Sequence, residues 1–171
     1  MKIDQEQLFE QLFDAAGEGI ILVNKGGTIL MANTRIVEMF GYSKEEITGQ
    51  HLNILVPKAI RSKHSKHLER YFMAPKSRYM GLGLHLEAET KSEKLFPVEI
   101  SLNHFEEKGI TYVIALITDV TERKIQEGKI LKLNEELEQR VALRTEQLTK
   151  SEQLYSTIAK NFPDGTINVF D

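Results

Sequence analysis

The chain has 171 residues, a net charge of −3 and 41% apolar residues, a composition typical of one globular domain with an appendage. Acidic and basic residues are interspersed, so the charge gives no electrostatic basis for binding nucleic acid or an anionic membrane. The absence of cysteine excludes disulfides, thiolate catalysis, zinc–thiolate sites and iron–sulfur clusters.

Two further absences concern targeting. The N-terminus carries acids where a signal peptide needs an apolar core. No apolar run approaches the roughly 18–20 residues of a membrane span. We therefore expect no membrane segment within this chain. The lack of cysteine also fits a reducing compartment, and we expect a cytoplasmic location.

The N-terminal third predicts a helix, a hairpin and short helices. Apolar residues at helical spacing with Asp4 as N-cap predict a helix over residues 3–16. Two short apolar runs, 19–23 and 28–32, flank a turn that contains two glycines, which is typical of a β-hairpin. Short helices should follow, one ending at Gly41 and one opened by a capping box in residues 43–46.

The middle of the chain predicts one more helix and three strands. The helix should run from about residue 59 to residue 73 and stop before Pro75. Apolar patterns at 78–90, 95–105 and 110–118 predict strands. Glu89 and Glu99 are expected to face outward. Five strands with short helices on one face make an antiparallel α+β fold.

Residues 122–160 predict a long helix. The stretch contains no proline and is rich in strong helix formers. Such a helix with little apolar surface needs a partner, so we expect a homodimeric coiled coil. The alternative is one amphipathic helix folded back on its own domain. One heptad seam contains Ile130, Asn134, Leu137, Val141, Arg144, Leu148, Ser151, Tyr155 and Ile158.

The end of the chain resembles its beginning. An apolar helix followed by acid-Gly-x-Ile-x-Val occurs near residue 18 and again at Asp164–Val169. A second, truncated copy of the same domain in residues 161–171 would explain this, and chance similarity is the alternative.

The order of these elements resembles the PAS family of sensory domains. The resemblance implies a flanking helix at 1–18, a PAS domain at 19–121 and a signalling helix at 122–160. It implies signal detection and dimerisation through the helix, with relay to a C-terminal effector such as a histidine kinase. The motifs that carry it are Glu18-Gly19-Ile20, Asn33, the run from Phe40 to Gly49, the run from Phe96 to Ile100, and the run from Asp119 to Arg123.

The junction between the last strand and the long helix contains Asp119, Thr121 and Arg123. In the family, this acid, hydroxyl and arginine are thought to couple the sheet to the helix. Simple capping of the helix start is the alternative. Polar seam residues such as Asn134 and Arg144 lower coiled-coil stability and leave two registers close in energy, which suits a switch.

Part of the chain resembles haem-binding PAS domains of oxygen-sensing histidine kinases. The resemblance implies His64 as the iron ligand and Arg70 and Arg78 as partners of the haem propionates. The position of the distal arginine that would bind oxygen is Leu84, which puts oxygen sensing in doubt. An exposed or structural histidine is the alternative, and nothing completes a metal site from His64 and His67. Ile100 and Leu102 match the residues that line the gas side.

Other cofactors and activities find less support. Flavin photoreceptors that form a cysteinyl adduct and coumarate sensors both need a cysteine, which this chain lacks. A small organic ligand bound without a covalent link is compatible with an apolar pocket. No catalytic constellation is visible, so we do not expect an enzyme in this segment. Two functions compete: a sensor of a small ligand or cofactor, and a ligand-free dimerisation and relay module with a filled core.

Overall fold

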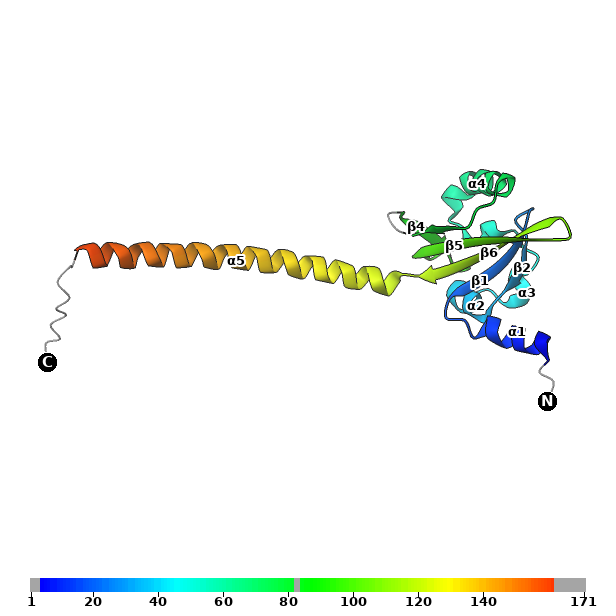
Figure 1. Ribbon diagram of the computed structural model, residues 1–171, viewed down its shortest axis with the longest axis horizontal. Helices are drawn as coiled ribbons and strands as arrows, with labels where there is room; N and C mark the ends of the chain where they lie inside the picture. The colour runs from blue at the N-terminus through cyan, green and yellow to red at the C-terminus, as the bar shows by residue number, and fades with distance from the viewer. Residues whose placement is uncertain (1–3, 82–83, 162–171) are drawn as a thin grey trace. The chain divides into compact units, whose positions relative to one another are not determined.

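The structure is a computed structural model that describes residues 4–81 and 84–161. It divides into two compact units, Met1–Glu122 and Arg123–Asp171. The first unit is an antiparallel sheet with helices (Figure 1). The second consists of helix alone in the part that is described. The predicted repeat after residue 161 lies outside the described residues.

The sheet of the first unit is antiparallel throughout, with the strand order β2-β1-β6-β5-β3, and β4 also pairs with β5. Its two long strands, β5 and β6, form a hairpin in the middle of the sheet. The tight turn between them places Lys108 and Gly109 at positive φ, as a type I′ turn requires. The strands are β1 (Gly19–Asn24), β2 (Ile29–Ala32), β3 (Arg78–Met80), β4 (Leu86–Glu89), β5 (Leu95–Glu107) and β6 (Ile110–Asp119).

The strand predicted over residues 78–90 is two strands, β3 and β4. Met80 pairs with Ile100 and Leu86 pairs with Val98, so a single residue of β5, Glu99, separates the two pairings. Five chain positions separate Met80 from Leu86, so β3 and β4 are not one continuous strand. The predicted antiparallel α+β class is confirmed, with six strands in five sheet positions rather than five unbroken strands.

Short helices connect β2 to β3. They begin where the sequence supplies caps: Ser43 and Glu46 form the predicted capping box, and Gly41 ends the preceding helix in the left-handed region. Four of the five elements in this stretch bury side chains: α2 (Thr34–Phe40), α3 (Lys44–Ile47), the 3-10 turn η1 (Leu52–Leu55) and α4 (Arg61–Met73). The 3-10 turn η2 (Lys58–Ile60) buries none.

The core lies on one face of the sheet. Along β1 and β6 alternate side chains are buried, as expected for strands with one covered face. Two apolar clusters cover that face. The larger joins α2, α3 and η1 to the sheet, and includes Ile36, Phe40 and Val98. The smaller places Tyr71 and Phe72 of α4 against the sheet.

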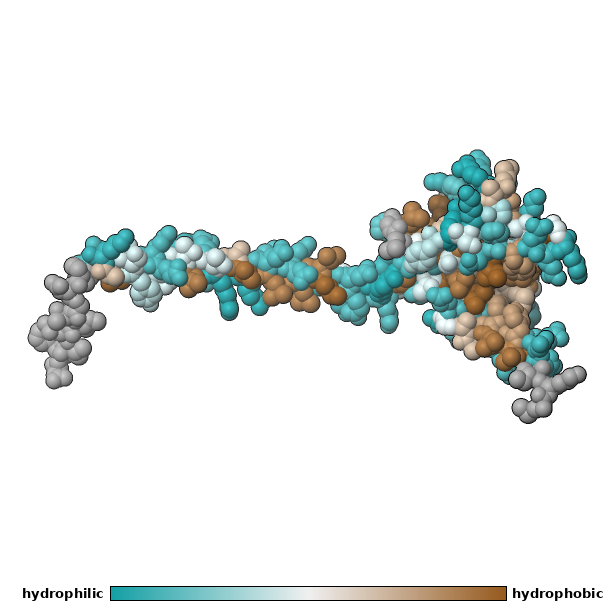
Figure 2. Space-filling model, viewed as in Figure 1, coloured by the Kyte–Doolittle hydropathy of each residue, from teal (hydrophilic) through white to brown (hydrophobic). Residues whose placement is uncertain are grey.

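Two helices flank the sheet along the chain. The first, α1 (Gln5–Asp14), is capped by Asp4 as predicted and buries no side chain. The last, α5 (Thr121–Asn161), has 41 residues, and none of them is buried, so the predicted long C-terminal helix is confirmed. Figure 2 shows apolar side chains exposed along α5 between hydrophilic ones. Among the described residues, no helix has the length and apolar character needed to cross a membrane.

Candidate functional site

Arg70 and Arg78, predicted to act together, line one cleft. The cleft has a volume of about 580 Å³ and lies between the C-terminal half of α4 and the start of β3. Among the described residues, none that lines it is acidic. Its polar lining consists of His67, Arg70, Tyr71, Lys76, Ser77 and Arg78.

Tyr71 fixes the shape of this cleft. Its hydroxyl donates a hydrogen bond of 3.0 Å to the carbonyl oxygen of Lys76, which holds the link between α4 and β3 against the helix. The guanidinium carbon of Arg78 lies 4.9 Å from the centre of the Tyr71 ring, a cation–π contact. Burial raises the pKa of Tyr71, although the Arg78 charge opposes this rise. The phenol therefore stays protonated and keeps its role as a donor.

The predicted aliphatic residues lie on the covered face of the sheet. Ile100 and Leu102 are half-buried against the core, and Leu102 pairs with Arg78 across β5 and β3. Leu84, in contrast, follows the interruption of the edge strand and is 52% exposed. The structure thus brings Arg78 and Leu102 together but leaves Leu84 in contact with solvent.

His64 is half-buried on α4 and has a defined partner. Its Nδ1 lies 3.1 Å from Oδ1 of Asn53. The Asn53 amide donates to the hydroxyl of Ser65, which in turn donates to the carbonyl of Arg61. Asn53 Oδ1 is therefore an acceptor, and Nδ1 of neutral His64 must carry the proton. Nε2 then holds the lone pair that a metal ion would need.

The space between α4 and the sheet is occupied by side chains. Tyr71 and Phe72 contact each other edge to face, with ring centres 6.1 Å apart. Together with Val113 they form a buried cluster against which Leu68 and Leu102 pack. Side chains of α4 and of the sheet therefore pack directly against one another in this region.

The residues that the resemblance assigned to haem do not all line one cavity in this structure. His64 has the tautomer an iron ligand requires, but among the described residues it does not line the cleft of Arg70 and Arg78. The distal position, Leu84, is exposed rather than placed over a cavity. The histidine therefore acts here as a hydrogen-bond donor to Asn53. Within the described chain, no group of three metal-binding side chains is placed to hold a metal ion.

The His64→Gln variant should weaken the acid sensitivity of the fold. Burial, followed by the charges of His67 and His51, lowers the pKa of His64 below its usual 6.5. As the pH falls through that usual value, the unfolded chain binds a proton that the native chain does not, so stability falls until the lowered native pKa is passed. Glutamine keeps a donor toward Asn53 but cannot be protonated, so this component disappears.

Urea denaturation between about pH 8 and pH 5 measures the effect, because protonation linkage changes the free energy of unfolding. The matched control is His85→Gln, at an exposed position, which should leave the pH profile unchanged. An unaltered profile in His64→Gln would show that His64 is not buried in its neutral form.

Glu89 corrects an expectation. It was predicted to face outward, yet it is 7% exposed. Its carboxylate accepts from the backbone N–H of Lys58 at 2.9 Å and pairs with Arg61 at 3.2 Å. Arg61 also donates to the carbonyl of Val56 at 2.9 Å. This network attaches the start of α4 to β4, so it holds one end of the helix that carries His64 and Arg70.

The residues predicted to couple sheet and helix lie at the junction. Asp119 is the last residue of β6, where it pairs with Val98, and Thr121 is the first of α5. One carboxylate oxygen of Asp119 accepts from both the backbone N–H (2.8 Å) and the hydroxyl (2.5 Å) of Thr121. Arg123 lies 3.7 Å from Glu127, one turn further along. The helix cap is therefore supplied by the last residue of the central strand.

The predicted seam of α5 is exposed in this single chain. Leu137, Val141 and Leu148 are 54%, 63% and 60% exposed, and Asn134 and Arg144 are exposed as well. Side chains three and four residues apart lie on one side of a helix. The seam is therefore an unpartnered apolar stripe interrupted by polar residues.

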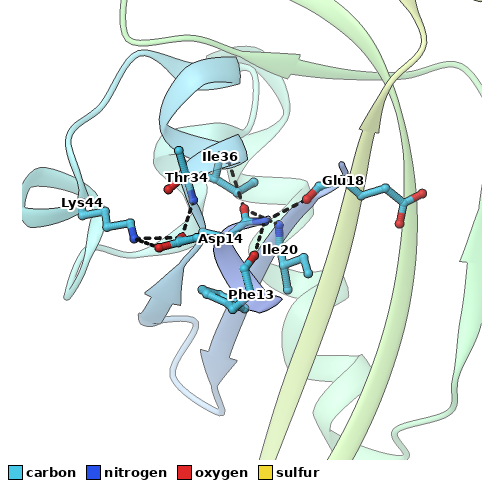
Figure 3. A network of polar contacts seen from close by, with 8 residues as sticks. Phe13, Asp14, Glu18, Ile20, Thr34, Ile36 and Lys44 are labelled. Carbon is cyan, nitrogen blue, oxygen red and sulfur yellow. Dashed lines mark hydrogen bonds and ion pairs between the residues drawn. The ribbon is translucent and has the colours of Figure 1, made fainter. Parts of the chain in front are cut away.

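Asn33 has a structural role that the sequence did not reveal. Its side chain is completely buried, and its Oδ1 accepts from the backbone N–H groups of Ile20 (2.9 Å) and Ile36 (3.2 Å). Its Nδ2 donates to the carbonyls of Phe13 (3.1 Å) and Glu18 (2.9 Å). Figure 3 shows these partners converging from α1, the following loop, β1 and α2. One side chain therefore ties the end of α1 to the sheet.

Beside this hub, Asp14 at the end of α1 forms an ion pair of 2.7 Å with Lys44 and accepts from the backbone N–H of Thr34 at 2.9 Å (Figure 3). The Lys44 ammonium holds the pKa of Asp14 below its usual value. One sequence signal could have indicated the role of Asn33: it is a polar residue directly between a hairpin and a helix, a position typical of an N-cap.

A family of sequences described as "PAS domain" matches residues 17–122. The chain belongs to the PAS domain family. The matched range covers the whole sheet of the first unit and the helices that pack on it, and this confirms the resemblance seen in the sequence.

Sensor proteins are among the relatives of this PAS domain. The chain is 27% identical over 120 residues to "Sensor protein FixL" of Bradyrhizobium diazoefficiens, covering 70% of this chain and 24% of FixL. It is 24% identical over 115 residues to "Oxygen sensor protein DosP" of Escherichia coli, covering 67% and 14%. "Sporulation kinase E" of Bacillus subtilis is 28% identical over 131 residues, covering 76% and 17%. The chain thus spans less than a quarter of these relatives' lengths.

Solved structures agree on the fold. The PAS domain of an HTR-like protein from Haloarcula marismortui has a TM-score of 0.57 at 18% identity, covering 68% of this chain and 97% of that one. An RNA-binding light-oxygen-voltage receptor has a TM-score of 0.62 at 15% identity, covering 77% and 37%. At such identities the likeness concerns the PAS fold alone.

Proposed function

We propose that this chain is the sensory and relay segment of a longer signalling protein. The PAS domain receives the input, α5 pairs with α5 of a second copy, and the paired helices carry the change to an effector on the C-terminal side. The name of one relative, "Sporulation kinase E", supports a kinase as that effector, and "Sensor protein FixL" supports a sensory input.

The observation that carries this proposal is the shared role of Asp119. It is both the last paired residue of β6 and the side chain that caps α5. Because only Val120 lies between strand and helix, a shift of β6 must be accommodated at the first turn of α5. The exposed seam of α5 supplies the reason for pairing, because an isolated helix with exposed apolar residues gains stability from a partner.

A filled interior supports one part of the alternative function. Tyr71 and Phe72 occupy the space between α4 and the sheet, so the domain holds its shape there without an interior ligand. We therefore propose that the input does not enter between α4 and the centre of the sheet. The proposed relay through α5 does not depend on where on the domain the input acts.

Cross-linking tests the relay. The chain has no cysteine, so single cysteine substitutions from residue 130 to residue 150 give no background. On oxidation, cross-linked dimers should peak at the heptad spacing of the seam. The Asp119→Ala variant, which removes the cap of α5, should change the positions that cross-link best. A profile without peaks would contradict pairing, and a profile that Asp119→Ala leaves unchanged would contradict the coupling.

Haem is tested separately by absorption. Titration of the purified chain with haemin should give no Soret band beyond that of free haemin, because the interior is filled and His64 is held by Asn53. A stoichiometric Soret band that disappears in His64→Ala would overturn this expectation and establish His64 as an axial ligand. The matched control is His85→Ala, which changes an exposed histidine outside the helix.

A further inference from the structure

The cleft between α4 and β3 concentrates positive charge in a chain whose net charge is −3. Arg70, Lys76 and Arg78 all line it, and Ser77 adds a hydroxyl. Among the described residues, no carboxylate lines the cleft. The three cationic side chains are exposed, so water and salt screen their mutual repulsion, and an anion bound between them would lower it further.

The arginines of the domain divide into two pairs. Arg35 and Arg61 each form an ion pair with a glutamate. Arg70 and Arg78 form no ion pair with any carboxylate in the described part of the chain. Both unmatched arginines of this domain therefore lie in the same cleft.

Tyr71 positions the guanidinium of Arg78 and the backbone at Lys76. The ring of Tyr71 holds the guanidinium of Arg78, and the hydroxyl of Tyr71 holds the backbone at Lys76. Such preorganisation lowers the entropy lost when a ligand is bound. Arg70 lies in the last turn of α4, where it also offsets the negative end of the helix dipole. The helix dipole is equivalent to about half a negative charge at this end of α4. It does not account for the positive charges of Lys76 and Arg78.

We propose that this cleft binds a small anion that carries at least two carboxylate or phosphate groups. Arginine presents a planar fork that matches both groups, and two arginines on different elements suit two such groups on one molecule. The volume of about 580 Å³ lies in the range of small-ligand sites, about 300–1,000 Å³. Tyr71 also lines the cleft, and its ring keeps the guanidinium of Arg78 in place through the cation–π contact.

The proposed ligand also gives the relay an input, and in this respect the inference rests on the proposed function. Arg70 belongs to α4 and Arg78 to β3, so an anion bound by both would link the helix to the edge of the sheet. Arg78 pairs with Leu102 in β5, and Leu102 pairs with Ala115 in β6, the strand that ends at the cap of α5. Three neighbouring strands therefore connect the cleft to the signalling helix.

Isothermal titration of the whole chain with succinate, citrate and inorganic pyrophosphate tests the binding. At least one of them should bind one to one in low-salt buffer, and the carboxylate and phosphate arms separate the two sources of this chemistry. Arg70→Gln and Arg78→Gln should each weaken that binding at least about tenfold, since a charge-assisted hydrogen bond contributes about 1.5–3 kcal/mol. The control is Arg35→Gln, an arginine outside the cleft, and it should change the affinity less than about twofold.

Failure of the inference is distinct from failure of the relay. If none of the three anions binds, or if Arg70→Gln and Arg78→Gln bind as tightly as the unaltered chain, the cleft is not an anion site. The cross-linking profile of α5 is independent of that result. Arg78→Gln removes an aromatic contact and could disturb the fold. Arg70→Gln removes no such contact, so it tests the cleft even if Arg78→Gln misfolds. Circular dichroism checks the fold of both variants.

Discussion

Replacing Asn33 by aspartate should destabilise the PAS domain by about 3–5 kcal/mol at neutral pH, the typical effect of an uncompensated buried charge. The aspartate would keep the acceptor that serves Ile20 and Ile36. It would lose the amide that donates to Phe13 and Glu18 and face two carbonyl oxygens with a negative charge. Because the position is completely buried, water cannot compensate.

The pH dependence separates this cause from simple loss of packing. Burial beside carbonyl oxygens should raise the native pKa of the new carboxyl above its unfolded value of about 3.9. The substitution should therefore lower the free energy of unfolding little in acid and more as the pH rises. Urea denaturation should therefore show Asn33→Asp closest to the unaltered chain at low pH. Asn103→Asp, at an exposed position, is the control and should have little effect. Equal stability of Asn33→Asp and the unaltered chain at pH 7 would contradict the hub.

The second large effect concerns the seam of α5. Leu137→Asp should convert the proposed dimer to monomer, because each dimer loses two buried leucines and gains two charges at the seam. Burial of a leucine contributes about 1.5–3 kcal/mol, so the two copies give about 3 kcal/mol or more. That free energy corresponds to at least about a hundredfold rise in the dimer dissociation constant. Sedimentation velocity over a range of protein concentrations measures it.

A control on the same helix tests the choice of seam. Leu143 is as exposed as Leu137 (56% and 54%) but lies off the seam, so Leu143→Asp should leave the dimer intact. Asn134→Leu should strengthen the dimer, because a polar residue on the seam lowers its stability. If the unaltered chain sediments as a monomer, the dimer proposal fails. If Leu143→Asp dissociates it as strongly as Leu137→Asp, the seam is elsewhere.

Features that depend on neighbouring residues were predictable from the sequence. The capping box at Ser43 and the stop at Gly41 occur as expected, and a tight turn at Gly109 joins the strands predicted at 95–105 and 110–118. Each follows from a rule that operates within about four residues, such as capping or positive φ. The order of elements and the α+β class followed from these local signals.

Features that depend on distant residues were not predictable in the same way. Glu89 looked like an outward strand residue, but its burial is compensated by Lys58 and Arg61, which lie 31 and 28 residues away along the chain. The four partners of Asn33 likewise lie up to 20 residues away along the chain. Alternation assigns a face to a side chain but does not specify the groups that will meet it there.

The broken edge of the sheet affects how copies of this chain associate. The long strands β5 and β6 lie inside the sheet, while its margins are formed by β2, with four residues, and by β3 and β4, with three and four. Short, interrupted margins offer few consecutive unpaired backbone groups to a foreign strand. Strand addition, the first step toward cross-β fibrils, therefore has little template here. We expect concentrated solutions of this chain to resist fibril formation through its sheet.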